Sequence, residues 1–134
     1  MSNKKEIGVL PPNFKREVRS LKLLNILTWD DLYNLTDEDL YAIVNKYFAS
    51  INNLRKLRNI GLFICALNME QQEASILMHT GISSLEALAR CSPEDLISRT
   101  GRLERQLNTS RANQFNMKKA NHLIQLAKDR QKQN

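Results

Sequence analysis

Glycine and proline are scarce in this chain of 134 residues, which contains only four glycines and three prolines. An all-β sandwich needs a turn about every 8–12 residues, so this scarcity argues against that fold class. It also argues against a glycine-rich loop that cradles a nucleotide phosphate. Hydrophobic residues make up 42% of the chain, which is enough for a packed core and too much for a disordered protein.

Long apolar runs and clustered cysteines are missing as well. The longest apolar run, residues 60–67, is much shorter than the ~18–20 residues that span a bilayer. The basic residues at the N-terminus are not followed by the apolar stretch of a signal peptide. Cys65 and Cys91 stand alone in apolar segments, which favours two buried free thiols and offers no zinc site. We therefore expect a cytoplasmic protein that does not enter a membrane.

Acidic residues are outnumbered, with 14 Asp and Glu against 20 Lys and Arg, which gives a net charge of +6. The surplus is uneven: residues 1–28 hold 6 basic and 2 acidic residues, residues 29–80 hold 4 and 7, and residues 81–134 hold 10 and 5. The positive charge therefore belongs to the N-terminal part and to the C-terminal half, while the middle of the chain is acidic.

Helix-capping patterns recur along the chain, and no segment alternates with a period of two for long enough to predict a strand. A hydroxyl side chain three residues before an acid places an oxygen on free amides and a negative charge near the positive helix end. This pattern occurs at Thr28 with Asp31, Thr36 with Asp39, Ser83 with Glu86, and Ser92 with Asp95. We predict an all-α fold.

The other helices are predicted from apolar spacing and weaker caps. Asn13 is expected to cap a first helix that buries Phe14, Val18 and Leu21, spaced four and three apart. Asn68 is expected to cap a helix over residues 69–79, which Gly81 would end in a left-handed conformation. The longer helices are expected at about 51–67 and 116–131, with Ile51, Leu54, Leu57, Ile60 and Ile64, and Met117, Ala120, Leu123, Ile124 and Ala127, facing inward.

An internal repeat appears when residues 26–40 are laid over residues 82–96. The tripeptide Glu-Asp-Leu is identical in the two stretches, at 38–40 and 94–96. Apolar residues and caps also agree at Ile26/Ile82, Thr28/Ser84, Trp29/Leu85, Leu32/Leu88, Leu35/Cys91, Thr36/Ser92 and Leu40/Leu96. Trp29 is therefore expected in the core.

The repeat predicts how the chain is divided. Residues 1–12 are expected to form a flexible basic arm, 13–68 a first helical repeat, and 69–134 a second repeat with an insertion at 106–116. Neither repeat is large enough to bury much alone, so we expect the two to share one core.

The sequence resembles tandem helix-hairpin-helix proteins, and most of all an uncharacterised bacterial group known only as a domain of unknown function. The resemblance lies in residues 81–89 (Gly-Ile-Ser-Ser-Leu-Glu-Ala-Leu-Ala), in 92–96 (Ser-Pro-Glu-Asp-Leu) and in the Thr-Gly pair at 100–101. It implies two helix-hairpin-helix-like repeats and binding to DNA without sequence specificity. In that family a Gly-hydrophobic-Gly hairpin lets backbone amides approach a phosphate.

The expected hairpins depart from that family pattern. The second, at 100–103, has one glycine, and the first, at 45–50, has none. Any nucleic-acid binding must therefore rest on side-chain charge. We expect it to involve Arg99, Arg102 and Arg105 beside the second hairpin, Lys118 and Lys119 at the start of the closing helix, and their first-repeat counterparts Arg55, Lys56 and Arg58.

Two alternatives remain open for these charges. They can form an ordinary solvated surface, and Lys15, Arg16, Arg19 and Lys22 on the first helix can equally serve an acidic protein partner. Two aromatic residues near the first hairpin, Tyr47 and Phe48, either form an exposed apolar tip or pack inside.

No active site can be assembled from the sequence. His79 and His122 are far apart, and the carboxylates cluster at helix starts, where the helix dipole explains them. We expect no enzyme, no cofactor, no metal and no small-molecule substrate. The expected function is a non-catalytic module that binds the backbone of DNA or structured RNA without sequence specificity. The alternative is a protein–protein adaptor that has lost the phosphate clamp.

Overall fold

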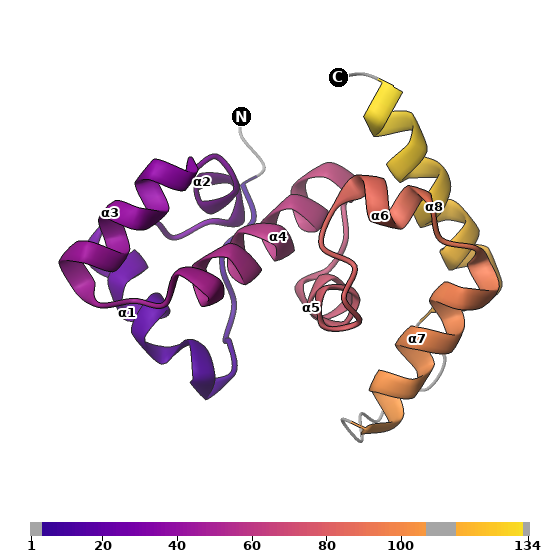
Figure 1. The fold of residues 1–134 in the computed structure, drawn as a ribbon, viewed down its shortest axis with the longest axis horizontal. Helices are drawn as coiled ribbons and strands as arrows, with labels where there is room; N and C mark the ends of the chain where they lie inside the picture. The colour runs from indigo at the N-terminus through magenta and orange to yellow at the C-terminus, as the bar shows by residue number, and fades with distance from the viewer. Residues whose placement is uncertain (1–3, 107–114, 133–134) are drawn as a thin grey trace. The chain divides into compact units, whose positions relative to one another are not determined.

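The computed structural model describes residues 4–106 and 115–132, apart from the side chains of 104–106, and these residues are mainly helical (Figure 1). The described residues form a short 3-10 helix η1 and eight α-helices: η1 Pro12–Phe14, α1 Lys15–Leu23, α2 Trp29–Tyr33, α3 Asp37–Tyr47, α4 Ile51–Leu67, α5 Gln71–His79, α6 Leu85–Ala89, α7 Pro93–Gln106 and α8 Met117–Lys132. This confirms the all-α prediction. No helix in this part of the chain is both long and apolar enough to cross a membrane.

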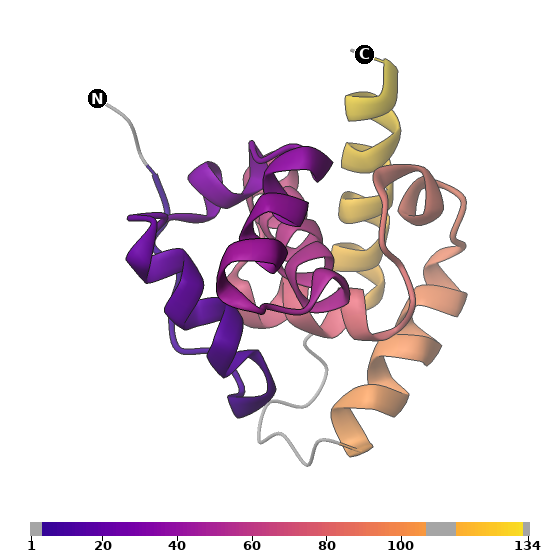
Figure 2. The ribbon, with the colours of Figure 1, turned by 60° about the vertical axis from the view of Figure 1, so that its left-hand side comes forward.

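The chain divides into two compact units, which are described separately. Unit 1 comprises Met1–Cys65 and unit 2 comprises Ala66–Asn134. In unit 1, α1 packs against η1 and α3. In unit 2, α6 and α7 lie beside α8 (Figure 2), and α5 packs against α7.

Each unit has its own buried apolar residues. Trp29 is buried in unit 1, as predicted, and Gly61 of α4 allows this close packing because a Cβ there would lie 3.2 Å from the Trp29 carbonyl oxygen. The unit 1 core also includes Phe14, Leu21, Leu32, Leu40, Leu54, Leu57 and Ile60. The unit 2 core includes Leu77, Ile82, Leu88, Leu96, Ala120, Leu123 and Ala127.

Three of the four predicted hydroxyl caps are confirmed. The side chains of Thr28 and Ser92 accept hydrogen bonds from the backbone N–H groups three residues on, and Thr36 forms a reciprocal capping box with Asp39. The fourth pattern, Ser83 with Glu86, is wrong by one residue, whereas the repeat alignment of Thr28 with Ser84 identifies the cap correctly. Ser84, not Ser83, caps α6, because extended backbone at Ser84 places its hydroxyl oxygen 3.0 Å from the Ala87 amide nitrogen.

Two weaker cap predictions are also wrong. Asn13 lies inside η1, and α1 begins after it without a side-chain cap. Asn68 has a positive φ of 54° just after α4, so the cap of α5 is Glu70, which forms a capping box with Glu73. The left-handed stop at Gly81 is confirmed, with a φ of 93°.

The predicted inward faces are mostly confirmed. Leu54, Leu57, Ile60 and Ile64 of α4 are buried, and so are Ala120, Leu123, Ile124 and Ala127 of α8. Two residues at helix starts are exceptions: Ile51 of α4 is only half-buried, and Met117 of α8 is exposed.

The predicted second hairpin at 100–103 is wrong, because these residues lie inside the continuous helix α7. Thr100 is buried, and its hydroxyl donates to the Leu96 carbonyl oxygen one turn earlier, at 2.8 Å. The predicted first hairpin at 45–50 is shorter than expected, since α3 continues to Tyr47. Phe48 then turns the chain with a φ of 60°, a left-handed conformation.

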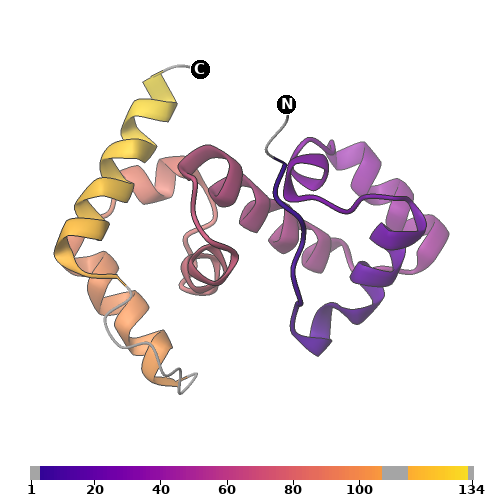
Figure 3. The same ribbon diagram turned by 180° about the vertical axis from the view of Figure 1, so that it is seen from behind.

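The expected flexible arm at 1–12 is held in place over residues 4–7. Ile7 donates its N–H to the Leu27 carbonyl oxygen, and Lys5 accepts a hydrogen bond from the Trp29 N–H at 2.8 Å. Glu6 and Thr28 form an isolated antiparallel bridge, and the segment then runs on to η1 (Figure 3). Backbone groups of residues 5–7 thus pair with residues 27–29 at the start of α2.

Helices of the two units begin at matching positions. The starts of α5, α6 and α7, at residues 71, 85 and 93, follow those of α1, α2 and α3, at 15, 29 and 37, by one constant offset. This is the same offset that lays residue 26 over residue 82, and it also relates the two positive-φ residues before α2 and α6, Asn25 and Gly81. The start of α8, at 117, follows that of α4, at 51, by a larger offset.

Candidate binding surfaces

Two of the predicted cations lie on one side of α7. Arg99 and Arg102 are exposed and three residues apart, which places them on neighbouring turns of this helix. Arg99 forms an ion pair with Asp95, with 3.2 Å between Nε and Oδ2, whereas Arg102 forms no ion pair within the described residues. The side chain of Arg105 lies outside the described residues.

The two lysines at the start of α8 have different roles. Asn116 caps this helix through its side-chain oxygen, which lies 2.8 Å from the Lys119 amide nitrogen. Lys118 is exposed and, among the described residues, has no ion-pair partner. Lys119 turns toward α5 and pairs with the buried carboxylate of Glu73. Lys119 is therefore committed to the fold, while Lys118 is available at the surface.

The first-unit candidates divide in the same way. Arg55 donates to the Tyr41 hydroxyl at 2.9 Å and lies over its ring. Arg58 bonds to the Leu35 carbonyl oxygen and pairs with Asp37 at 2.6 Å. The hydrogen bond from Arg58, followed by its charge, lowers the pKa of the Asp37 carboxyl.

Lys56 is therefore the remaining surface cation of the first-unit set. It is exposed and makes no ion pair in the part of the chain that the structure describes. The eight predicted cations are thus not equivalent, because several of them hold the fold together.

A buried carboxylate occupies the start of α4, a feature that the sequence did not indicate. Glu17 of α1 is only 1% exposed. Its Oε2 accepts from the Ser50 N–H at 2.9 Å, and its Oε1 accepts from the Asn53 side-chain amide at 3.0 Å. The Ser50 amide, which follows the turn at Phe48, is thus already bonded to an anionic group of the same chain. A phosphate cannot take that amide unless Glu17 moves away.

Unit 2 has a similar carboxylate in Glu73 of α5, which is 4% exposed. It pairs with Lys119 near the start of α8 and accepts from the Glu70 N–H at 3.1 Å. Glu17 and Glu73 are related by the offset of the α1 and α5 starts, and their partners Asn53 and Lys119 by the offset of the α4 and α8 starts. Each buried carboxylate therefore joins the first and fourth helix of its unit.

Among the described residues, the largest group of unpaired cations on one helix lies on α1. Lys15, Arg16, Arg19 and Lys22 are all exposed, and none forms an ion pair with any residue that the structure describes. The only acidic residue of this helix is Glu17, which points inward. Four positive charges on one short helix therefore face solvent.

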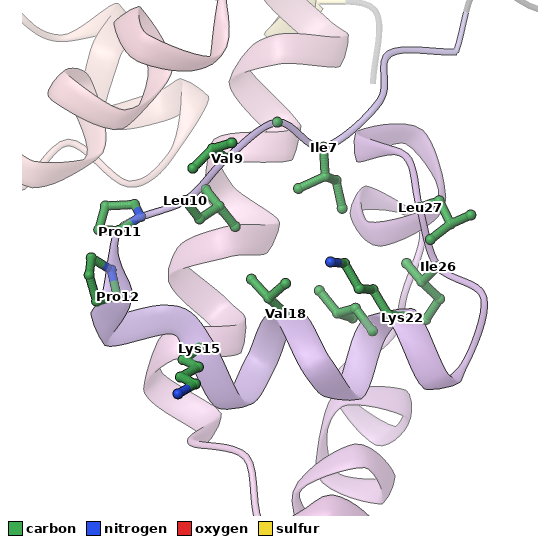
Figure 4. A pocket seen from close by; sticks show the side chains of 12 residues that line it. Ile7, Val9, Leu10, Pro11, Pro12, Lys15, Val18, Lys22, Ile26 and Leu27 are labelled. Carbon is green, nitrogen blue, oxygen red and sulfur yellow. The ribbon is translucent and has the colours of Figure 1, made fainter.

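An apolar groove lies along the same helix, as Figure 4 shows. It has a volume of about 520 Å³ and runs between α1 and the extended segment at residues 7–12. Val18 of α1 and Ile7 of the segment face each other across it, and the ammonium group of Lys22 reaches toward the segment (Figure 4). The sequence did not reveal this groove because residues 7–12 were expected to form a flexible arm.

The two thiols have raised pKa values, and the described residues contain no group of side chains that suits a metal ion. Burial, followed by the charge of Asp30, raises the pKa of Cys65 to about 11, and burial raises that of Cys91. Both cysteines are free thiols, as predicted, although they are half-buried, and both are held in the less reactive protonated form. Among the described residues, no three His, Cys, Asp or Glu side chains gather in a group that could hold a metal ion.

Comparison with known proteins identifies one family. The family, described as a domain of unknown function (DUF4332), matches residues 11–130. No curated protein and no solved structure matches the chain.

Proposed function

The chain belongs to the DUF4332 family, and we propose that it is a non-catalytic binding module made of two copies of one four-helix unit. Equal separations of the helix starts support the duplication, since α1, α2 and α3 each precede their counterpart by the same offset. The pairing of Glu17 with Asn53 in one unit and of Glu73 with Lys119 in the other supports it independently. The larger offset at the fourth helix corresponds to an insertion before α8 in unit 2.

We infer further that each unit is a diverged helix-hairpin-helix. Phe48 adopts the left-handed conformation that a hairpin glycine adopts without strain, and buried Ala49 follows it. Ser50 then caps α4, as Asn116 caps α8 after buried Phe115. By the offset of the α4 and α8 starts, Phe115 and Asn116 correspond to Ala49 and Ser50, so residues 100–103 are not the counterpart of the first hairpin.

The proposed partner of unit 2 is the phosphate backbone of a nucleic acid, bound without base recognition. The observation that carries this proposal is the exposure of Arg99, Arg102 and Lys118 on two helices that pack together, α7 and α8. Side-chain cations neutralise phosphates without reading bases. The hairpin amides are not needed for this mode, which suits a chain whose first hairpin amide is already bonded to Glu17.

Fluorescence anisotropy with labelled duplex DNA and duplex RNA, across a salt series, tests the proposal. We expect a dissociation constant of about 1–100 μM that rises steeply with salt. Replacing Arg99, Arg102 and Lys118 together by alanine should make the salt slope shallower by about 2–3, roughly one for each lost phosphate contact. A preference for one of the two probes would identify DNA or RNA as the partner.

A matched variant controls for net charge. Replacing Lys15, Arg16 and Arg19 of α1 by alanine also removes three positive charges, but from exposed positions in unit 1. This variant should keep most of the salt dependence of nucleic-acid binding. Equal losses in both variants would contradict a site in unit 2, and no binding even at low salt would reject nucleic acid in favour of the protein adaptor.

A further inference from the structure

We propose that the groove of unit 1, between α1 and residues 7–12, binds an acidic amphipathic helix of a partner protein. The site differs in unit and in chemistry from the nucleic-acid surface proposed for unit 2. Its floor and walls are aliphatic, with Ile7, Leu10 and Val18 among the lining residues. Such a surface favours apolar side chains from a partner, which leave water when they enter it.

The positive charges around the groove favour a negatively charged partner. Lys15 and Lys22 of α1 are the only charged residues among those that line it. Arg16 and Arg19, on the same helix, are exposed and unpaired within the described part of the chain. A partner helix with acidic residues beside its apolar face would therefore complement the groove and the positive charge of α1.

The apolar surface extends beyond the groove itself, which favours a protein segment over a small molecule. Val9 is 97% exposed at one wall, and Leu27 is exposed at the other. An amphipathic helix presents apolar residues at several successive turns and would cover the groove together with these exposed walls.

The same charges argue against a second copy of this chain as the occupant. Symmetric pairing of two grooves would bring two copies of α1 together, each with four unpaired cations and no exposed acid. Like charges facing one another across an interface oppose association.

A pair of synthetic peptides tests the proposal on the full chain. Both carry leucine on one helical face; one has glutamate beside this face, and its twin has lysine at the same positions. Labelled peptide is titrated with protein and followed by anisotropy. We expect the glutamate peptide to bind at least about tenfold more tightly than its twin at low salt, since opposite charges attract and like charges repel.

Charge reversal makes the test specific. Replacing Lys15 and Lys22 by glutamate should weaken the glutamate peptide about tenfold and strengthen the lysine peptide. Replacing Val9 and Leu27 by aspartate should weaken both peptides, and because both residues are exposed the fold should be kept. Trp29 fluorescence and circular dichroism check the fold of each variant. Reversal of the matched cations Arg102 and Lys118 in unit 2 should change neither peptide's affinity.

Several results would overturn the proposal. Equal binding of the two peptides, or binding that ignores the Lys15 and Lys22 reversal, would exclude a charge-selected groove. Displacement of the glutamate peptide by palmitate at equal concentration would indicate a fatty-acid site instead. A dimer in sedimentation velocity that the Val9 and Leu27 variant dissociates would identify a second copy as the occupant. Failure of the unit 2 nucleic-acid experiment would leave this proposal standing, because the two use different residues.

Discussion

The buried carboxylate of unit 1 is held by neutral groups, whereas that of unit 2 is held by a charge. Glu17 accepts from the Ser50 amide and the Asn53 side chain, while Glu73 faces the Lys119 ammonium and the Glu70 amide. The two arrangements occupy matching positions in their units. The carboxylate contact between the first and fourth helices of a unit can therefore be made with or without an ion pair.

The exposed surfaces of the two units differ more than their buried carboxylate contacts. Helix α1 carries four exposed cations, whereas the matching positions of α5 are Gln71, Gln72, Ser75 and Met78. Among the described residues of unit 2, most of the exposed cations lie instead on α7 and α8. Both units have the buried carboxylate contact, but their exposed cations lie on different helices. We therefore assign the units different partners.

Loss of the ion pair in unit 2 should cost the most stability. Replacing Lys119 by alanine leaves the Glu73 carboxylate buried with the Glu70 amide as its remaining donor. We expect a loss of about 2–3 kcal/mol in the free energy of unfolding, below the full cost of breaking a buried pair because Lys119 is partly exposed. Replacing Asn53 by alanine in unit 1 should cost less, about 1–2 kcal/mol, because Glu17 keeps the Ser50 amide.

Urea unfolding followed by circular dichroism measures both losses. Lys118 is the control, since it is adjacent to Lys119 and exposed, and its replacement by alanine should change stability by less than about 0.5 kcal/mol. A Lys119 variant as stable as the Lys118 variant would contradict a structural role for the pair.

The all-α class and most helix positions were predictable because caps and apolar spacing are local signals. Thr28, Thr36 and Ser92 cap as predicted, since a hydroxyl needs only the amide three residues on. The continuous helix through residues 100–103 was not predictable from Gly101, because a glycine inside a helix and one in a turn look alike in sequence. The burial of Thr100 favours the helix over a turn at this point, and this burial depends on packing within unit 2.

The site was predictable only as a list of charges. Sequence spacing cannot show that Lys119 meets Glu73, or that Arg58 meets Asp37, because both pairs join different helices. Nor can it show the groove, which exists because backbone bonds hold residues 5–7 against the segment before α2. One signal was present: the aliphatic residues Val9 and Leu10 are unusual in a free arm.

Replacing the left-handed residue before the second helix of a unit should have an intermediate effect on stability. Gly81 has a φ of 93° with open space where a Cβ would stand, so a side chain there would be penalised only through the backbone. Replacing Gly81 by alanine should lower the free energy of unfolding by about 1–2 kcal/mol. Asparagine, the residue that unit 1 has at Asn25, tolerates this conformation better and should cost about 0.5–1 kcal/mol.

Thermal and urea unfolding of the two Gly81 variants measure this order. The reciprocal change, Asn25 to glycine, should be close to neutral, because asparagine already accepts a positive φ at little cost. Equal losses for alanine and asparagine at position 81 would show that the two turns are not equivalent.

The weakest predicted effect is the acid sensitivity of the Asp37–Arg58 pair, which has no counterpart in unit 2. The hydrogen bond from Arg58 lowers the pKa of Asp37, while the residues at the matching positions of unit 2, Pro93 and Ile124, cannot form such a pair. Because the folded-state pKa lies below the unfolded value of about 3.8–3.9, the pair stabilises unit 1 above that pH and stops doing so as the pH falls through the folded value. Trp29, the single tryptophan, reports on unit 1.

Urea midpoints from Trp29 fluorescence, measured from about pH 5 down to about pH 2, should therefore fall less in an Asp37→Asn variant than in the wild type. The difference should be small, since the pair is largely at the surface and such pairs contribute little. Glu38→Gln is the matched control, because Glu38 is the next residue and is exposed. If the two variants had the same pH dependence, the Asp37–Arg58 pair would not distinguish unit 1 from unit 2.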